Sequence, residues 1–147
     1  MAVDVVTEIW IDRPVGAVAS YMADPSHAPE WYANIDSVEW VTEPPVGVGS
    51  RVAFVARFLG RTLRYTYEVV SFDPASGLVM RTAEGPFPME TTYSWHAVPE
   101  GTLVALRNRG QPSGFAAVGT PFIGAAMRRA NRKDLLALKR VVESHPR

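Results

Sequence analysis

The chain has 147 residues, enough for one hydrophobic core and too few to demand a second, so we expect a single domain over 1–147. Its 15 basic and 15 acidic side chains cancel, which gives no electrostatic reason to expect binding to nucleic acid. There is no cysteine, so disulfides and thiol catalysis are excluded.

The first residues do not read as a targeting segment. They carry Asp4 and Glu8 and lack the basic start and apolar run of a signal peptide. No stretch approaches the ~18 apolar residues of a membrane span, so we expect a cytoplasmic protein without stable membrane insertion. Arg supplies 13 of the 15 basic residues, and Ala, Val, Gly and Pro are frequent, a composition typical of GC-rich bacterial genomes.

Periodicity and turn residues predict seven strands and three helices. Apolar residues alternate in the segments between Gly- and Pro-rich turns, which indicates strands, and the turns have hairpin lengths, which indicates an antiparallel sheet. Val15, Val18 and Met22 recur at helical spacing before Asp24-Pro25. We expect strands at 3–11, 35–41, 51–59, 62–72, 77–84, 89–98 and 102–109, short helices at 14–23 and 27–32, and a long amphipathic helix at 120–143.

Short sequence pieces in a particular order carry a family resemblance. They are Ile11-Asp-Arg-Pro-Val-Gly-Ala-Val18, Ala23-Asp-Pro25 with Trp31, Val48-Gly-Ser-Arg51, Tyr67-Glu-Val69, Phe72-Asp-Pro74, Gly101-Thr102, and Asp134-Leu-Leu-Ala-Leu-Lys139 with Glu143. Together they resemble the START-like SRPBCC superfamily, above all its polyketide cyclase/dehydrase branch. The resemblance implies an α+β helix-grip fold: a seven-stranded antiparallel sheet curved around a long C-terminal helix, with two short helices after the first strand. It also implies members that bind lipids, steroids, polyketides or hormones, or that catalyse cyclisation and dehydration.

A mismatch in side-chain size predicts an internal cavity. The long helix begins with small residues, among them Gly124, Ala126 and Ala130, whereas the facing strands supply Phe, Tyr, Trp and Met. Small residues leave space opposite a concave sheet, and such space is the usual form of a small-molecule site. We therefore expect a cavity of several hundred Å³ that binds a hydrophobic small molecule, and the resemblance implies a ligand of lipid, polyketide or aromatic/isoprenoid type.

The period of two along each strand predicts which side chains line this cavity. Loops at 59–61, 85–88 and 110–120 should cluster at one end and form its mouth, where Phe87 and Phe115 either cover the ligand or plug the core. The predicted ligand-binding residues are Trp31, Phe54, Phe58, Tyr65, Tyr67, Met80, Phe87, Met89, Tyr93, Asn108, Phe115, Met127 and Asn131.

Catalytic patterns are sparse. The three histidines have no ligand spacing, and no nucleophile motif is present, so we expect neither a metal nor another cofactor. Glu84 is predicted to face inward near the mouth, where burial would suit a general acid or base; alternatively it escapes to solvent at the strand end. Asp134 lies on the apolar side of the long helix, where it either orients a ligand hydroxyl or pairs with Arg or backbone donors.

Three functions follow, in order of preference. The first is binding of a hydrophobic small molecule by a monomer or homodimer. The alternative is a polyketide cyclase or dehydratase that uses acid and base groups in the cavity. The last is a protein-interaction module, which the charged outer face of the sheet disfavours. That face is predicted to carry Arg51, Arg57, Arg64, Glu68, Arg81, Glu90, Arg107 and Arg109.

Overall fold

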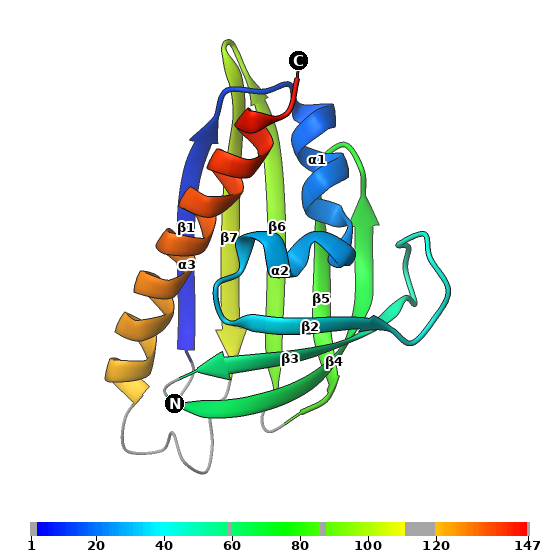
Figure 1. The fold of residues 1–147 in the computed structure, drawn as a ribbon, viewed down its shortest axis with the longest axis vertical. Coiled ribbons are helices and arrows are strands. Elements are labelled where there is room, and N and C mark those ends of the chain that lie inside the picture. Colours follow the sequence, from blue (N-terminus) through cyan, green and yellow to red (C-terminus); the bar gives the residue numbers. More distant parts are fainter. Residues whose placement is uncertain (1–2, 59, 86–87, 111–119, 147) are drawn as a thin grey trace.

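The computed structural model describes residues 3–58, 60–85, 88–110 and 120–146 (Figure 1). The described elements are β1 (Val3–Ile11), α1 (Val15–Ala23), a 3₁₀ turn η1 (Pro25–His27), α2 (Ala28–Trp31), β2 (Ile35–Trp40), β3 (Arg51–Phe58), β4 (Arg61–Asp73), β5 (Gly77–Glu84), β6 (Met89–Val98), β7 (Gly101–Gly110) and α3 (Thr120–Ser144). Each predicted strand and helix is present, with bounds that are identical or differ by one residue at an end.

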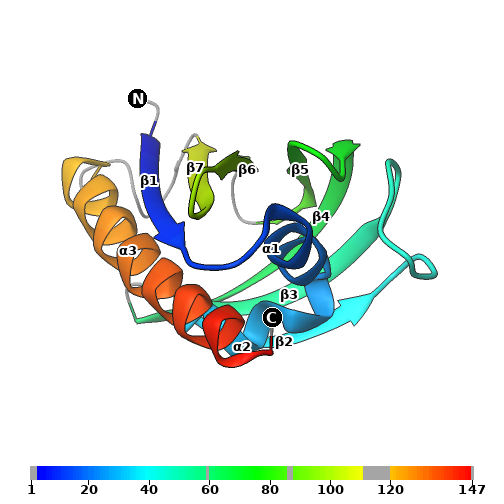
Figure 2. The same ribbon diagram turned by 90° about the horizontal axis from the view of Figure 1, so that it is seen from above.

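The strands form one seven-stranded sheet in the order β1-β7-β6-β5-β4-β3-β2, with every neighbouring pair antiparallel. Strands β2 to β7 follow one another in sequence and in space, and β1 joins the sheet beside β7. The sheet curves strongly, and α3 lies along its concave side, where it packs against β1 and α2 (Figure 2). The predicted helix-grip fold is confirmed.

The main core lies beneath the C-terminal half of α3. Leu135, Leu138 and Val142 are almost fully buried there, together with Trp95 and Leu106 from the sheet. Burial of such large side chains is the main source of stability in a domain of this size. The Trp95 indole N–H also donates to the backbone oxygen of Pro74 at 2.9 Å, so its polar atom is satisfied.

The loop between β1 and α1 ties down the C-terminal end of α3. The backbone N–H of Asp12 donates to Oε2 of Glu143 at 2.8 Å. The Arg13 guanidinium donates to the backbone oxygens of Glu143 and His145. The Arg13 donors satisfy carbonyl groups that a helix end leaves unpaired. The last turns of α3 are therefore held against the sheet.

The outer face of the sheet is charged, as expected. Ion pairs join Arg51 with Glu68, Arg107 with Asp4, and both Arg81 and Arg109 with Glu90. All of these pairs are partly or largely exposed, so each contributes little to stability. They nevertheless leave this face polar.

One predicted orientation is wrong because β5 contains a bulge. Thr82 lies opposite Tyr67, but the next pair is Glu84 with Thr66, so Ala83 is an extra residue in the ladder. An extra residue reverses the alternation of side chains beyond it. Glu84 is consequently exposed rather than inward-facing.

Candidate functional site

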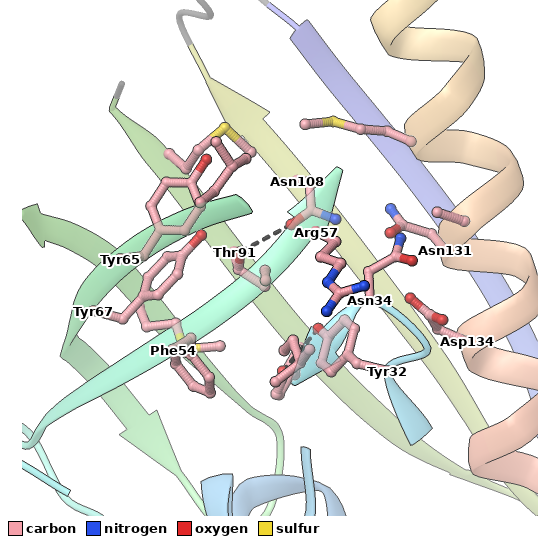
Figure 3. Close-up of a pocket in the computed structure, with 18 residues that line it drawn as sticks. Tyr32, Asn34, Phe54, Arg57, Tyr65, Tyr67, Thr91, Asn108, Asn131 and Asp134 are labelled. Atoms are coloured by element: carbon pink, nitrogen blue, oxygen red, sulfur yellow. Dashed lines mark hydrogen bonds between the residues drawn. The ribbon is translucent and has the colours of Figure 1, made fainter. Parts of the chain in front are cut away.

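A cavity of about 150 Å³ lies between the first half of α3 and the concave face of the sheet (Figure 3). Its lining consists of Tyr32, Asn34, Ile35, Phe54, Ala56, Arg57, Leu63, Tyr65, Tyr67, Met80, Met89, Thr91, Tyr93, Asn108, Met127, Ala130, Asn131 and Asp134. It is smaller than the several hundred Å³ expected, because the large side chains of the inner sheet face fill part of the concave space.

Helix α3 contributes one short side chain, Ala130, to the cavity, together with three longer ones. Met127, Ala130, Asn131 and Asp134 recur every three or four residues, so they share one face of the helix. Ala130 is too short to reach the sheet, whereas Leu135 and Leu138 in the next turns are long enough to fill the core. The change from small to large side chains along α3 therefore places the cavity under its first half.

The sheet contributes an aromatic and apolar side. Tyr67 meets Phe54 edge-on with ring centroids 5.6 Å apart, and Tyr65 lies 5.8 Å from Tyr67. Met80 and Met89 complete this wall from β5 and β6. Thioether and aromatic side chains adapt to varied apolar shapes, which suits a hydrophobic ligand.

Polar side chains from α3, from the connection before β2 and from β7 lie on the opposite side of the cavity, and Thr91 of β6 lies between them and the tyrosines (Figure 3). The Thr91 hydroxyl donates to Oδ1 of Asn108 at 2.8 Å. Nδ2 of Asn131 is buried and has no hydrogen-bond partner among the described residues. The backbone N–H of Ala33 donates to Oδ1 of Asp134 at 3.0 Å. Of the two predicted roles of Asp134, pairing with a backbone donor is therefore observed.

Burial alters the acidity of several cavity groups. It raises the pKa of Asp134 to about 6, although the Ala33 N–H and the charge of Lys133 act in the opposite direction. It also raises the pKa of Tyr67 to about 12 and those of Tyr32 and Tyr93 above their usual value. The phenols therefore stay protonated at neutral pH, and Asp134 titrates close to it.

Arg57 lies at the rim of the cavity. Its side chain is 71% exposed, and its Nε atom lies 3.0 Å from Oδ2 of Asp36 on β2. The sequence pattern assigns Arg57 to the outer face; in the structure its strand partner is Thr62 of β4, and its backbone N–H donates to the backbone oxygen of Asn34, just before β2 begins at Ile35. A cavity-lining residue that is this exposed marks the point where the cavity reaches the surface.

Nine of the predicted ligand-binding residues line the cavity. They are Phe54, Tyr65, Tyr67, Met80, Met89, Tyr93, Asn108, Met127 and Asn131. Glu84 is not among the lining residues. Phe87, Phe115 and most of the predicted mouth at 59–61, 85–88 and 110–120 lie outside the described residues, as does the side chain of Phe58.

Trp31 occupies a different position from the one expected. Its side chain is 2% exposed and stacks on the ring of Tyr32, with centroids 4.0 Å apart. It lines a second cavity of about 20 Å³ instead, next to Phe54, Tyr67, Met80 and Tyr93, which border both spaces. Tyr32 thus separates Trp31 from the main cavity.

Several lining residues were not predicted. Tyr32 and Asn34 belong to the connection from α2 into β2, where no periodic pattern indicates which side chain faces inward, and Ile35 is the first residue of β2. The one available signal was their proximity in sequence to Trp31. Their position depends on how α2 packs against α3, which is a tertiary contact.

Within the described residues, no group of three or more His, Asp or Glu side chains is arranged to hold a metal ion. No described helix is both long enough and apolar enough to cross a membrane.

The fold and the cavity define a helix-grip protein of the START type, and a family model agrees. The model described as "Polyketide cyclase / dehydrase and lipid transport" matches residues 2–143. The chain therefore belongs to this family. The family and fold support hydrophobic ligand binding or a polyketide cyclase-like function. None of the curated proteins matches the chain.

Solved structures share this fold at low sequence identity. TTHA0849 from Thermus thermophilus has a TM-score of 0.83 and 22% identity, over 96% of this chain and 97% of that one. A START superfamily protein from Mycobacterium smegmatis has a TM-score of 0.81 and 17% identity, over 96% and 97%. The Zhui aromatase/cyclase from Streptomyces sp. R1128 has a TM-score of 0.81 and 18% identity, over 97% and 94%.

Proposed function

We propose that the protein binds a hydrophobic small molecule in the cavity between α3 and the sheet. The observation that carries this proposal is the lining itself: aromatic and methionine side chains on one side and a few polar groups on the other. That combination is typical of sites for small organic ligands. A cytoplasmic location and a monomeric or homodimeric state are part of the same proposal.

A fluorescence titration tests the binding proposal. N-phenyl-1-naphthylamine is a neutral dye that brightens in apolar surroundings, and we expect saturable binding. Ala130→Phe should weaken binding at least tenfold, because the larger side chain occupies the cavity. Leu136→Phe is the matched control, since Leu136 lies on the same helix and is 50% exposed. Equal affinities of wild type and a folded Ala130→Phe variant would contradict the proposal.

Native mass spectrometry of freshly purified protein gives an independent test. A copurifying small molecule would appear as a mass above that of the chain, and the same spectrum reports whether the protein is a monomer or homodimer. We expect Ala130→Phe to lose the added mass.

An acid–base enzyme acting in the same cavity is the second candidate, and Asp134 is the observation that favours it. Its carboxyl group lines the cavity and has a pKa of about 6, so it can exchange protons near neutral pH. A cyclase or dehydratase needs such a group. With a poly-β-keto substrate, Asp134→Asn should then lower turnover ~10²- to 10⁴-fold with little change in affinity. Absence of turnover by wild type would reject this candidate.

A further inference from the structure

Two polar side chains from α3 stand next to each other in the cavity. Asn131 and Asp134 are three residues apart, which places them one above the other on the same helix face. Both line the cavity, and their exposed fractions are only 5% and 3%. Figure 3 shows both side chains directed from α3 toward the cavity, on the side opposite Tyr65 and Tyr67.

Asn131 offers an unused hydrogen-bond donor. Its Nδ2 atom is buried, and no described residue accepts a hydrogen bond from it. Leaving a buried amide donor unpaired is destabilising and uncommon in folded proteins. The acceptor that fits this donor is therefore expected to come from a molecule in the cavity.

Asp134 offers an unused acceptor beside that donor. Oδ1 accepts the backbone N–H of Ala33, whereas Oδ2 has no hydrogen bond with the described residues. The bond from Ala33 fixes the orientation of the carboxyl group, because Ala33 belongs to the connection between α2 and β2. A donor and an acceptor are thus held in adjacent turns of one helix.

The chemistry of this pair selects among possible ligand groups. A ketone satisfies the Asn131 donor but offers nothing to Asp134. An ammonium group donates to Asp134 but cannot accept from Asn131, and a carboxylate is repelled by the Asp134 charge. A hydroxyl group both accepts and donates, so it satisfies both residues at once.

We propose that Asn131 and Asp134 form a hydroxyl-recognition subsite, so that the ligand is a neutral, largely apolar molecule carrying an alcohol or phenol group. Its oxygen accepts from Nδ2 of Asn131, and its hydrogen is donated to Oδ2 of Asp134. The hydrocarbon part lies against Met127, Leu63 and Met89, which line the same cavity. This inference rests on the proposed binding function.

Three probes that differ by one group test the subsite. Naphthalene has no hydrogen-bonding group, 2-methoxynaphthalene has an acceptor only, and 2-naphthol has both. In calorimetric or fluorescence titrations at pH 7, we expect 2-naphthol to bind roughly tenfold more tightly than naphthalene, with 2-methoxynaphthalene between them.

Variants then separate the two hydrogen bonds. In Asn131→Leu, 2-methoxynaphthalene should bind no better than naphthalene, because the donor is gone. In Asp134→Asn, 2-naphthol should bind no better than 2-methoxynaphthalene, because the acceptor is lost. Arg132→Leu is the matched control on the exposed face of α3. It should bind the three probes in the same order of affinity as wild type.

Each outcome is decisive. If wild type binds all three probes equally, the hydroxyl subsite is wrong while the cavity remains a binding site. If Asn131→Leu keeps the full preference for 2-naphthol, the subsite is also wrong. If folded wild type binds none of the probes and no N-phenyl-1-naphthylamine, both the subsite and the proposed function fail.

Discussion

The hydroxyl oxygens of Tyr32 and Tyr93 lie 2.9 Å apart and join the end of α2 to β6 across the inner wall of the cavity. The two residues are far apart in sequence, and both rings border the cavity. Because burial raises both pKa values, each hydroxyl stays protonated at neutral pH and one donates to the other. This bond positions the connection that carries Asn34 and leads into β2 at Ile35.

Removing either tyrosine hydroxyl should destabilise the fold. We expect Tyr32→Phe and Tyr93→Phe each to lower the free energy of unfolding by about 1 kcal/mol, since each leaves the other hydroxyl without its partner. The double variant should lose less free energy of unfolding than the two single variants lose together. Urea unfolding of wild type, both single variants and the double variant measures this coupling. Strictly additive losses would show that the bond contributes nothing.

Asp134 should make stability depend on pH. Its folded-state pKa of about 6 lies above its ordinary value of 3.8, so the folded protein holds the proton more tightly than the unfolded chain does. The contribution of Asp134 to the stability of the fold is therefore most favourable below about pH 4, and it is lost as the pH rises through about 6. Asp134→Asn keeps the acceptor for Ala33 and removes the charge.

We accordingly expect Asp134→Asn to raise the free energy of unfolding at pH 7, by on the order of 2 kcal/mol. The gain should shrink toward zero near pH 4, where Asp134 of the folded wild type is already protonated and therefore neutral. Urea unfolding at a series of pH values measures the difference. A gain of the same size at pH 4 and pH 7 would exclude titration of Asp134 as its cause.

Glu84→Gln should leave the cavity unaffected. Glu84 is exposed and lies outside the cavity lining, so removing its charge changes neither the shape nor the polarity of the site. We expect N-phenyl-1-naphthylamine affinity within about twofold of wild type, and unchanged turnover if any turnover is found. A large loss in either measurement would make Glu84 a site residue again.

Two glycines should respond in opposite directions to replacement by alanine. Gly16 lies in α1 with no atom within 4 Å of an added Cβ, so Gly16→Ala should raise the free energy of unfolding by about 0.5–1 kcal/mol. An added Cβ on Gly77 would overlap the backbone oxygen of Tyr93, so Gly77→Ala should lower it by about 1–3 kcal/mol. Thermal unfolding of both variants measures these changes. If Gly77→Ala were as stabilising as Gly16→Ala, the close approach of Gly77 to the backbone of Tyr93 would be contradicted.

Sequence reasoning succeeded where the pattern is local. In β6 and β7 the buried residues alternate without interruption, from Met89 to Trp95 and from Thr102 to Leu106, and a short turn pairs the strands. Alternation and hairpin turns are properties of neighbouring residues, so they predict strand bounds and pairing. The cavity was expected opposite small residues at the start of α3, and it does lie against this helix, but of those residues only Ala130 lines it.

The same reasoning failed where the direction of a side chain depends on how its segment pairs with another segment. The outward turn of Glu84 comes from one extra residue in β5 relative to β4, and no feature of β5 alone reveals it. Arg57 lies at the cavity rim beside Asn34, another lining residue, whose backbone oxygen accepts the Arg57 N–H just before β2 begins. Such mismatches are set by pairing between segments.

The sequence alone therefore determined the strands, the helices, their antiparallel pairing and most of the apolar lining, because these follow from residue size and periodicity along the chain, and the family resemblance implied the helix-grip arrangement. Only the tertiary structure decided which polar groups meet in the cavity. Asn131, Asp134, Tyr32 and Tyr93 come from two helical segments and a strand, and their unpaired atoms and shared hydrogen bond depend on how α2 and α3 pack on the sheet. Hydrogen bonds act only over short distances and in defined directions, so they emerge only once those segments are placed together.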